Sequence, residues 1–163
     1  TMCVSWHHQF NIPTKIVRLY HTYGPGIQLN DGRVFADFIS NILDTQNIEM
    51  KSDGSAIRSF CYSADAITGF ITVLLKGKNG EAYNVANDKA TVSIKRLAEI
   101  LVHLFPERKL KVIYKKRSKD DTYMESKISV NRPDTAKLRS LGWKPHFSIE
   151  EGFLRTIKSF ENK

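Results

Sequence analysis

Apolar residues recur along this chain in two spacings, as short continuous runs and as runs with the period of a helix. The run that starts at Ile16 predicts a buried strand over residues 14–20. It ends at the turn Gly24-Pro25-Gly26, a polar loop follows as far as Arg33, and helical spacing begins at Val34. Because α/β proteins bind ligands where a strand ends and a loop leads into a helix, this stretch is the first candidate ligand loop.

The same patterns predict the remaining elements. Two apolar runs, 48–51 and 57–62, flank Ser52-Asp53-Gly54, which is a hairpin signal. The other expected elements are the tail of a helix over 1–10, a helix capped by Ser63 and ending at Lys76-Gly77, a strand over 82–86, a helix capped by Ser93, a basic strand over 110–115, a loop over 117–131, a short helix capped by Asp134 or Thr135, and a helix after the capping box that begins at Ser148. Alternating short strands and amphipathic helices indicate an α/β fold.

The composition is that of one ordinary globular domain, with 163 residues, 41% hydrophobic and 26% charged. No apolar run is long enough to span a membrane, and no secretory signal is visible. Cys3 and Cys61 lie far apart without a CxxC motif, which favours a reducing compartment, so we expect the cytoplasm.

A net charge of +8 calls for an anionic partner, which could be a nucleic acid, a membrane surface or a small molecule. The densest basic stretch is 108–119, where lysines alternate with apolar residues. This alternation is typical of a strand with one buried and one solvated face, and no nucleic-acid motif accompanies it.

Candidate chemical groups are few. The histidines do not have the spacing of a metal site, so we expect no metal, and GxGxxG, GxxxxGK[ST] and GxSxG are absent. His21 lies where the buried strand meets the Gly-Pro turn, and can be either a satisfied polar group or a ligand contact. Arg33, Arg58 and Arg132 are candidates for an anion site, but spacing alone does not distinguish each of them from a solvated arginine.

Six segments together resemble one family. They are IVRLYHTYGPG (16–26), LNDGRVFADFI (29–39), SDGSAIRSFCYSADAITGF (52–70), AYNVAN (82–87), NRPDTAKLRSLGWKP (131–145) and SIEEGF (148–153). In this order and spacing they resemble the carboxyl half of an extended short-chain dehydrogenase/reductase of the NAD-dependent epimerase/dehydratase family. The UDP-glucuronate decarboxylases are the most similar branch.

The resemblance implies a Rossmann domain that holds NAD and a smaller domain that binds a UDP- or dTDP-linked sugar, which is oxidised transiently at C4. In the family a glycine-rich loop binds NAD, and the tyrosine and lysine of a YxxxK helix are catalytic. The chain lacks both where the family has them, so we expect no catalytic residue here and an inactive fragment. Residues 1–32 would end the Rossmann domain, 33–163 would be mainly the nucleotide-sugar domain, and 57–92 would return towards the sheet.

The resemblance also assigns site residues. Those on the cofactor side are Thr22, Tyr23, Pro25, Gln28 and Arg33, and those on the substrate side are Trp6, Gln9, His21, Val34, Arg58, Arg132 and Asp134. Arg58 matches the arginine that binds the UDP phosphates. His21 replaces the family's usual asparagine, Trp6 replaces a tyrosine, and close relatives have their arginine at the position of Asn131 rather than at Arg132.

Several alternatives stay open. Decarboxylase, dehydratase and epimerase are not separated, because the residues that distinguish them lie mainly outside this chain. A nucleotide-sugar-binding module without catalysis is the main alternative, and a basic nucleic-acid-binding domain that uses 108–119 is a lesser one. We expect a nucleotide-sugar ligand, neither nucleic acid nor a membrane as partner, and a homodimer at full length.

Overall fold

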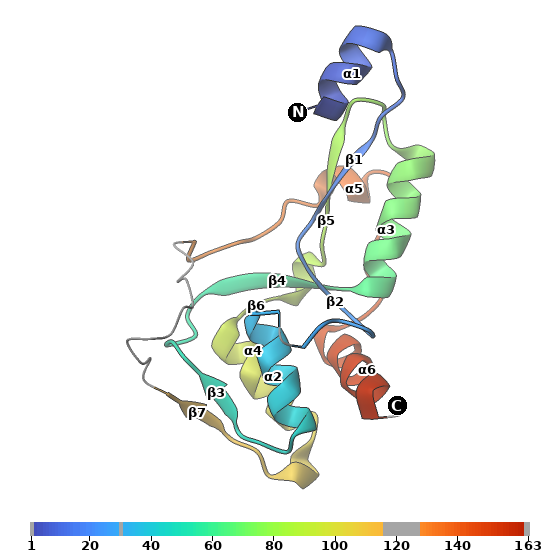
Figure 1. The fold of residues 1–163 in the computed structure, drawn as a ribbon. Helices are drawn as coiled ribbons and strands as arrows, with labels where there is room; N and C mark the ends of the chain where they lie inside the picture. The colour runs from blue at the N-terminus through green and yellow to red at the C-terminus, as the bar shows by residue number, and fades with distance from the viewer. Residues whose placement is uncertain (1, 30, 116–127, 162–163) are drawn as a thin grey trace.

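The computed structural model describes residues 2–29, 31–115 and 128–161. Its elements form two groups that meet at a central sheet (Figure 1). The upper group contains α1 (Met2–Phe10), β1 (Ile16–Leu19), α3 (Ser63–Lys76), β5 (Ala82–Val85) and α5 (Ala136–Arg139). The lower group contains α2 (Val34–Leu43), β3 (Ile48–Met50), α4 (Ile94–His103), β7 (Val112–Tyr114) and α6 (Ile149–Glu161). The fold also contains two single turns of 3-10 helix, η1 (Asp88–Ala90) and η2 (Pro106–Arg108).

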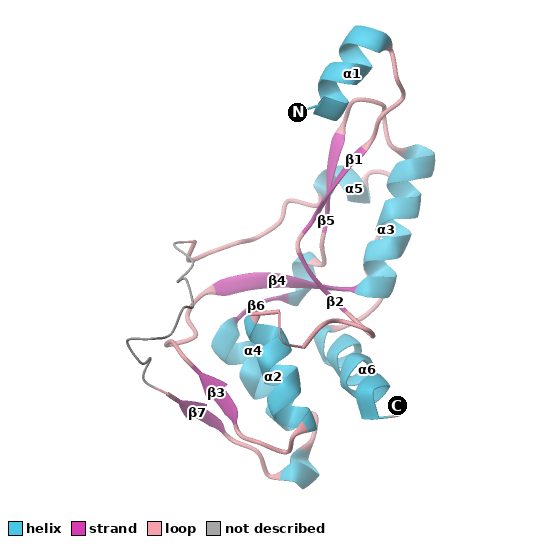
Figure 2. Ribbon diagram, in the orientation of Figure 1, coloured by secondary structure: helices cyan, strands magenta, loops and turns pink. Residues whose placement is uncertain are grey.

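The strand expected over 14–20 is confirmed as β1, and a second strand that was not expected follows it directly in a different sheet. β1 pairs in parallel with β5, with Ile16 opposite Ala82. After Tyr20 the chain continues as β2 (His21–Tyr23), which pairs in parallel with β4 (Ile57–Tyr62). β4 also pairs antiparallel with β6 (Thr91–Ser93), so that β4 lies at the centre of this sheet (Figure 2). The segment 16–23 therefore connects the upper and the lower group.

The hairpin expected around Asp53-Gly54 is wrong, although both strands exist. β3 pairs in parallel with β7, and not with β4. Gly54 has a positive φ of 71°, and its carbonyl accepts a hydrogen bond from the backbone N–H of Lys95 at 3.0 Å. A Cβ on Gly54 would lie 2.8 Å from that nitrogen. The glycine thus allows the backbone to lie close to the start of α4. After this turn β4 belongs to a different sheet from β3.

Two of the predicted helix caps are confirmed and a third is wrong. Ser93 accepts a hydrogen bond from the N–H of Arg96, and Ser148 accepts one from Glu151, as their capping patterns predict. Ser63, the expected cap of α3, is instead its first residue, and Tyr62 occupies the cap position without a side-chain hydrogen bond. α3 ends at Lys76 with Gly77 after it, as expected.

The lower core is an aromatic cluster that joins three elements. Tyr23 of β2 stacks on Phe153 of α6 with ring centroids 3.9 Å apart, and Phe60 of β4 meets both rings nearly edge-on. A Cβ on Gly152 would lie only 2.3 Å from the Tyr23 hydroxyl oxygen, so this close stacking depends on the glycine. The last helix of the chain therefore packs directly beneath the strand that begins at His21.

The basic strand expected over 110–115 is shorter and less buried than its alternation suggests. β7 covers only Val112–Tyr114, and although Leu110 is buried, Tyr114 is exposed. Most of the loop expected over 117–131 lies outside the described residues. Its last part is described, and Val130 forms a bridge beside Ile57 of β4.

Candidate functional site

An open cleft of about 600 Å³ lies where β1 and β5 end and β2 begins. Its lining residues are Arg18, Leu19, Tyr20, His21, Thr22, Arg33, Asn84 and Asn131. Because β1 and β5 are parallel, their carboxyl ends meet at this edge, which is where α/β sheets commonly bind ligands. Three of the sequence-predicted site residues, His21, Thr22 and Arg33, lie together here.

His21 occupies the start of β2, opposite Phe60 of β4, and its ring is tilted against the Phe60 ring at 5.7 Å. Burial lowers the pKa of its imidazole, and the positive charge of Arg58 lowers it further. A contact with the backbone of Ser59 raises this pKa, and Arg33 lowers it. Burial and the two arginines thus favour the neutral form of His21 at the edge of the cleft.

Arg33 is held at the mouth of the cleft by its own loop. Its Nε donates to a carboxylate oxygen of Asp31 at 2.6 Å, and a second guanidinium nitrogen forms an ion pair with the same carboxylate. The guanidinium also lies 4.7 Å from the centre of the Phe35 ring. The pair with Arg33 lowers the pKa of Asp31, and with 42% of its side chain exposed Arg33 can still reach a ligand.

Arg58 is not among the residues that line the cleft, although its charge acts on His21. It is only 9% exposed, and its guanidinium donates to the backbone carbonyls of Ile57, Ser129 and Ile128. Within the described part of the chain no carboxylate pairs with it. Since a guanidinium carries five N–H groups and neutral carbonyls provide no counter-charge, this buried cation can still accept an anion.

The segment that begins at residue 128 is held by the Arg58 side chain and by the backbone of its neighbour Ile57. Ile57 donates its N–H to Ser129 at 2.8 Å, and Asn131 donates its N–H back to Ile57 at 3.0 Å. This pairing brings Asn131 to the cleft, while the exposed Arg132 is not among its lining residues. The Asp134 carbonyl accepts from the Asn84 amide at 2.9 Å, and its carboxylate accepts from the N–H of Ala136 at the start of α5.

Four other predicted residues lie outside the cleft lining. Trp6, 48% exposed, and Gln9 are on α1, at the far end of the upper group from α2 (Figure 1). Pro25 and Gln28 are exposed in the loop after β2. The structure therefore does not bring these side chains together with His21.

The Tyr23 side chain lies inside the aromatic core and is 2% exposed. Its hydroxyl donates to the Ile149 carbonyl at 3.4 Å, and burial raises the pKa of this phenol. Any contact of Tyr23 with a cofactor would thus have to come from its backbone.

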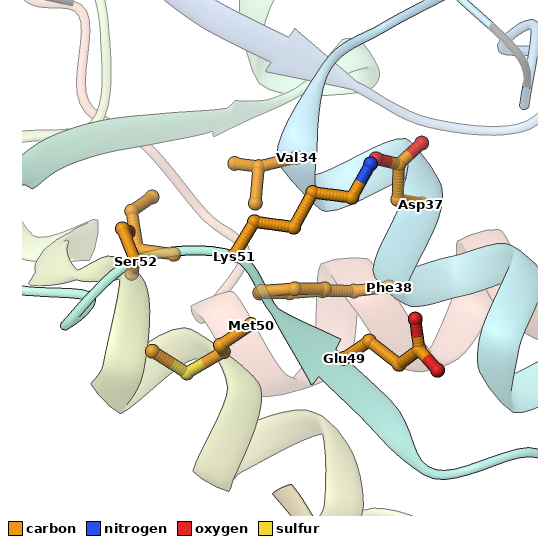
Figure 3. Close-up of a pocket in the computed structure, with 8 residues that line it drawn as sticks. Val34, Asp37, Phe38, Glu49, Met50, Lys51 and Ser52 are labelled. Carbon is orange, nitrogen blue, oxygen red and sulfur yellow. The ribbon is translucent and has the colours of Figure 1, made fainter. Parts of the chain in front are cut away.

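Val34 lines a separate, small cavity at the start of α2 (Figure 3). The Lys51 side chain extends across it towards Asp37, with Phe38 on the floor. Burial raises the pKa of the Asp37 carboxyl, and Lys51 opposes that shift. At about 30 Å³ this cavity has room for ordered water but not for a nucleotide.

Five lining residues were not predicted as site residues, and Arg18, Asn84 and Asn131 are the three with a charged or amide side chain. Arg18 and Asn84 lie on paired strands of the upper sheet, where Arg18 is directly opposite Asn84. Asn84 could have been found, because the segment AYNVAN is an apolar run that ends in polar residues. Arg18 gave no such signal, because a single arginine within an apolar run does not show which strand it faces.

A second cavity of about 450 Å³ lies between α4 and the start of α6. It contains basic side chains, Lys89, Arg96 and His146, but also Glu150. It shares no lining residue with the first cleft and contains none of the predicted site residues. It therefore provides a comparison site for ligand binding.

The described residues form neither a metal-binding cluster nor a membrane-spanning helix. They contain no group of three or more His, Cys, Asp or Glu side chains placed to hold a metal ion. No described helix has the length and apolar character needed to cross a membrane. The letters YxxxK do occur once, at Tyr123 and Lys127, but these positions lie outside the described residues.

Comparison with known proteins places this cleft in context. The model of the NAD dependent epimerase/dehydratase family matches residues 1–86, more than half of the chain. UDP-glucuronic acid decarboxylase 3 of Arabidopsis thaliana is 30% identical over 154 residues, which are 93% of this chain and 42% of that protein. UDP-glucuronic acid decarboxylase 1 of Xenopus tropicalis is 28% identical over 166 residues, which are 100% of this chain and 37% of that protein.

Solved structures share the fold. A dTDP-glucose 4,6-dehydratase from Bacillus anthracis in complex with NAD superposes with a TM-score of 0.82 at 18% identity, over 99% of this chain and 49% of that one. A UDP-glucuronic acid 4-epimerase from Bacillus cereus in complex with UDP-glucuronic acid and NAD gives 0.82 at 22% identity, over 99% and 49%. This chain thus spans about two fifths of its curated relatives and about half of these structures. The fold is that of Rossmann-type extended short-chain dehydrogenases/reductases.

Proposed function

Because this chain belongs to the NAD-dependent epimerase/dehydratase family, we propose that it forms the nucleotide-sugar-binding part of an enzyme that oxidises a sugar transiently at C4. A UDP-glucuronate decarboxylase-like reaction is the first choice, since the decarboxylases of Arabidopsis and Xenopus align along almost the whole chain. A 4,6-dehydratase or a 4-epimerase would use the same binding site.

The observation on which this proposal depends is Arg58, a buried guanidinium with only backbone carbonyls as described partners. A buried charge is costly unless an opposite charge compensates it, and a diphosphate provides two negative charges and fork-shaped acceptors. Arg33 and Arg18 line the adjoining cleft and add to its positive potential. A nucleotide sugar is thus the ligand whose charge and size suit both the buried arginine and the cleft.

NAD is the cofactor that we propose for the full-length protein. Thr22 and Arg33 would lie on its side of the cleft, with Gln28 and Pro25 nearby in the loop, while His21 belongs to the substrate side. The buried, unpartnered Nδ1 of His21 fits a site that a bound group completes. When bound, NAD would accept the hydride from the sugar, while this chain holds and orients the sugar nucleotide.

In the same proposal residues 1–32 end the Rossmann domain, 57–92 return to it, and most of 33–163 forms the sugar-nucleotide domain. Trp6, Gln9, Val34, Arg132 and Asp134 belong to the substrate side, where Val34 would contact the nucleotide. A homodimer and a cytoplasmic location stay predictions from the sequence.

Isothermal titration of the chain with UDP-glucose tests this proposal. We expect binding that Arg58→Ala weakens at least about tenfold, because hydrogen bonds to charged groups contribute about 1.5–3 kcal/mol. Arg58→Lys should recover part of the affinity, since it keeps the charge but loses the fork. Arg96→Ala is the matched control, because Arg96 is exposed, pairs with Glu99 and lies outside the cleft.

Equal affinity of the Arg58→Ala and Arg96→Ala variants, both shown to be folded by circular dichroism, would contradict the proposed site. A response to a short DNA duplex with none to UDP-glucose would contradict the function itself and favour the nucleic-acid alternative.

A further inference from the structure

α3 and β1, in the upper group of elements, expose large apolar side chains (Figure 1). On α3 these are Ile67, Ile71 and Leu74, which are 55%, 50% and 67% exposed. Their spacing of four and three residues places them on one side of the helix. On β1, Val17 is 36% exposed and Leu19 is 50% exposed. Because monomeric proteins seldom expose a large apolar patch, this one indicates an interaction surface.

The exposed side chains of β1 lie on the same side of the sheet as α3. Val17 is opposite Tyr83 of β5 and Leu19 is opposite Val85, and paired residues of neighbouring strands point to the same face. Tyr83 and Val85 are buried in one cluster with Val73 of α3. Since Val17 and Leu19 share this face but stay exposed, α3 covers it only in part, and a second helix has room beside α3.

β1 also has an open edge within the described residues, because it pairs with β5 alone. The N–H groups of Ile16 and Tyr20 point to β5, where they donate to the carbonyls of Glu81 and Val85. Because successive residues of a strand alternate, the N–H and C=O of Val17 point to the open edge. Such an edge is a template for pairing with a further strand.

We propose that this surface is the interface of a two-fold symmetric dimer of this chain. In the dimer the two β1 strands pair antiparallel at their open edges, and the two α3 helices pack side by side over them. The inference goes beyond the proposed function and does not depend on it.

The spacing of the elements suits a second copy. α3 packs on both β1 and β5, so its axis lies between these two strands. With two β1 strands at the centre and neighbouring strands about 4.8 Å apart, the two α3 axes lie two strand spacings, or about 10 Å, apart. Helices that pack against each other have axes about 8–10 Å apart. The two helices therefore meet without a gap and cover the β1 side chains between them.

The charges suit a second copy as well. Two copies of a chain with a net charge of +8 repel each other, so their contact requires a surface without charged groups. Residues 66–75 of α3 contain no charged side chain. A register centred on Val17 places Arg18 opposite Ile16 of the second copy, so the two arginines do not face each other. A strand from a longer Rossmann-type sheet would use the same edge, so it and a second copy exclude each other.

Sedimentation velocity of the chain, from about 1 to about 100 µM, tests for the dimer, because one 14-residue helix and one short strand make a small interface of moderate affinity. We expect the monomer to convert to a dimer over this range. Leu74→Glu should stay monomeric, since the dimer would bury its carboxylate without a partner. Tyr114→Glu is the matched control, because Tyr114 is exposed on β7 in the lower group, and it should dimerise as the wild type does.

A disulfide tests the register of the two strands. In a chain with the exposed Cys3 replaced by serine, Val17→Cys would place two thiols opposite each other. The Cα atoms of such a pair lie about 5.5 Å apart, which suits a disulfide. We expect mild oxidation to link Val17→Cys but not Leu19→Cys, because four residues of strand separate the two copies of residue 19 by at least about 13 Å.

A chain that stays monomeric at about 100 µM would overturn this interface and leave the open edge of β1 to a different partner. A dimer that Leu74→Glu leaves intact would overturn it too, as would oxidation that links Leu19→Cys as readily as Val17→Cys.

Discussion

His21 and Arg58 are the two residues whose surroundings depart most clearly from those of ordinary surface groups. Arg58 is buried against carbonyls, and the ring of His21 lies in the field of that cation. Each would cost stability in a protein without a ligand site, since a buried charge and an unpartnered polar atom are both unfavourable. We therefore interpret them as parts of a site that an anion completes.

The lowered pKa of His21 predicts how the stability of the ligand-free chain depends on pH. In the unfolded chain this histidine takes up its proton near pH 6.5, whereas the folded chain takes it up only at lower pH. The unfolded state therefore binds more protons as the pH falls through 6.5, and the free energy of unfolding decreases. Above pH 6.5 this contribution is fully present.

Urea unfolding at pH 7.5 and at pH 5.5 checks this prediction. The wild type should lose more than His21→Asn, by at most about 1.4 kcal/mol over this interval, because pH 5.5 lies only one unit below the ordinary pKa of histidine and solvent screening of the half-buried ring reduces the effect. An equal loss in the two proteins would show that folding does not hold His21 neutral.

Asp65 of α3 shows how one helix positions the segment ahead of another. Its carboxylate is buried and accepts the backbone N–H groups of His146 and Phe147 at 2.9 and 3.1 Å. The indole N–H of Trp143 also reaches the start of α3, where it donates to Thr68 at 3.1 Å. These bonds hold the chain between α5 and α6, so that α6 enters beneath β2.

Replacement of Asp65 by alanine removes both hydrogen bonds and leaves two N–H groups without their partner. We expect a loss of about 2–3 kcal/mol in the free energy of unfolding, measured by urea denaturation. Asp44→Ala is the control, because Asp44 is exposed at the end of α2, where a negative charge opposes the helix dipole. A loss no greater than that of the control would show that Asp65 does not hold this segment.

The sequence pattern was sufficient for most element positions, because helix caps and apolar periodicity are local. Ser93, Ser148 and the start of α2 at Val34 follow it directly. Strand partners are not local. The run that ends at Tyr20 gave no sign that a second strand, in another sheet, begins at His21. Asp53-Gly54 has the form of a hairpin turn, although its glycine serves contact with α4.

The predicted site residues also divide into those set by local sequence and those set by strand pairing. His21, Thr22 and Arg33 meet in one cleft, because all three lie near the end of one strand and the loop after it. Asn84 and Asn131 reach the cleft through pairing with segments that are distant in the sequence, and Arg18 is a single arginine within an apolar run, so apolar spacing alone did not select these three residues. The resemblance to a family provided what periodicity lacked, including the proposed role of Arg58.

The arrangement of the whole molecule explains why a cleft forms at this place. The upper and lower groups meet at β2 and β4, and the aromatic cluster of Tyr23, Phe60 and Phe153 fixes the lower group directly below (Figure 1). The segment at residues 128–131 pairs with the start of β4 at Ile57. Elements far apart in the sequence therefore converge on His21, with two arginines beside it.

A crystal structure of the chain grown with UDP-glucose is the most direct test of the claim that this cleft binds a nucleotide sugar. The account predicts the diphosphate within hydrogen-bond distance of the Arg58 guanidinium and the His21 ring, beside Asn131. A diphosphate bound instead in the cavity between α4 and α6, near Lys89 and Arg96, would contradict it.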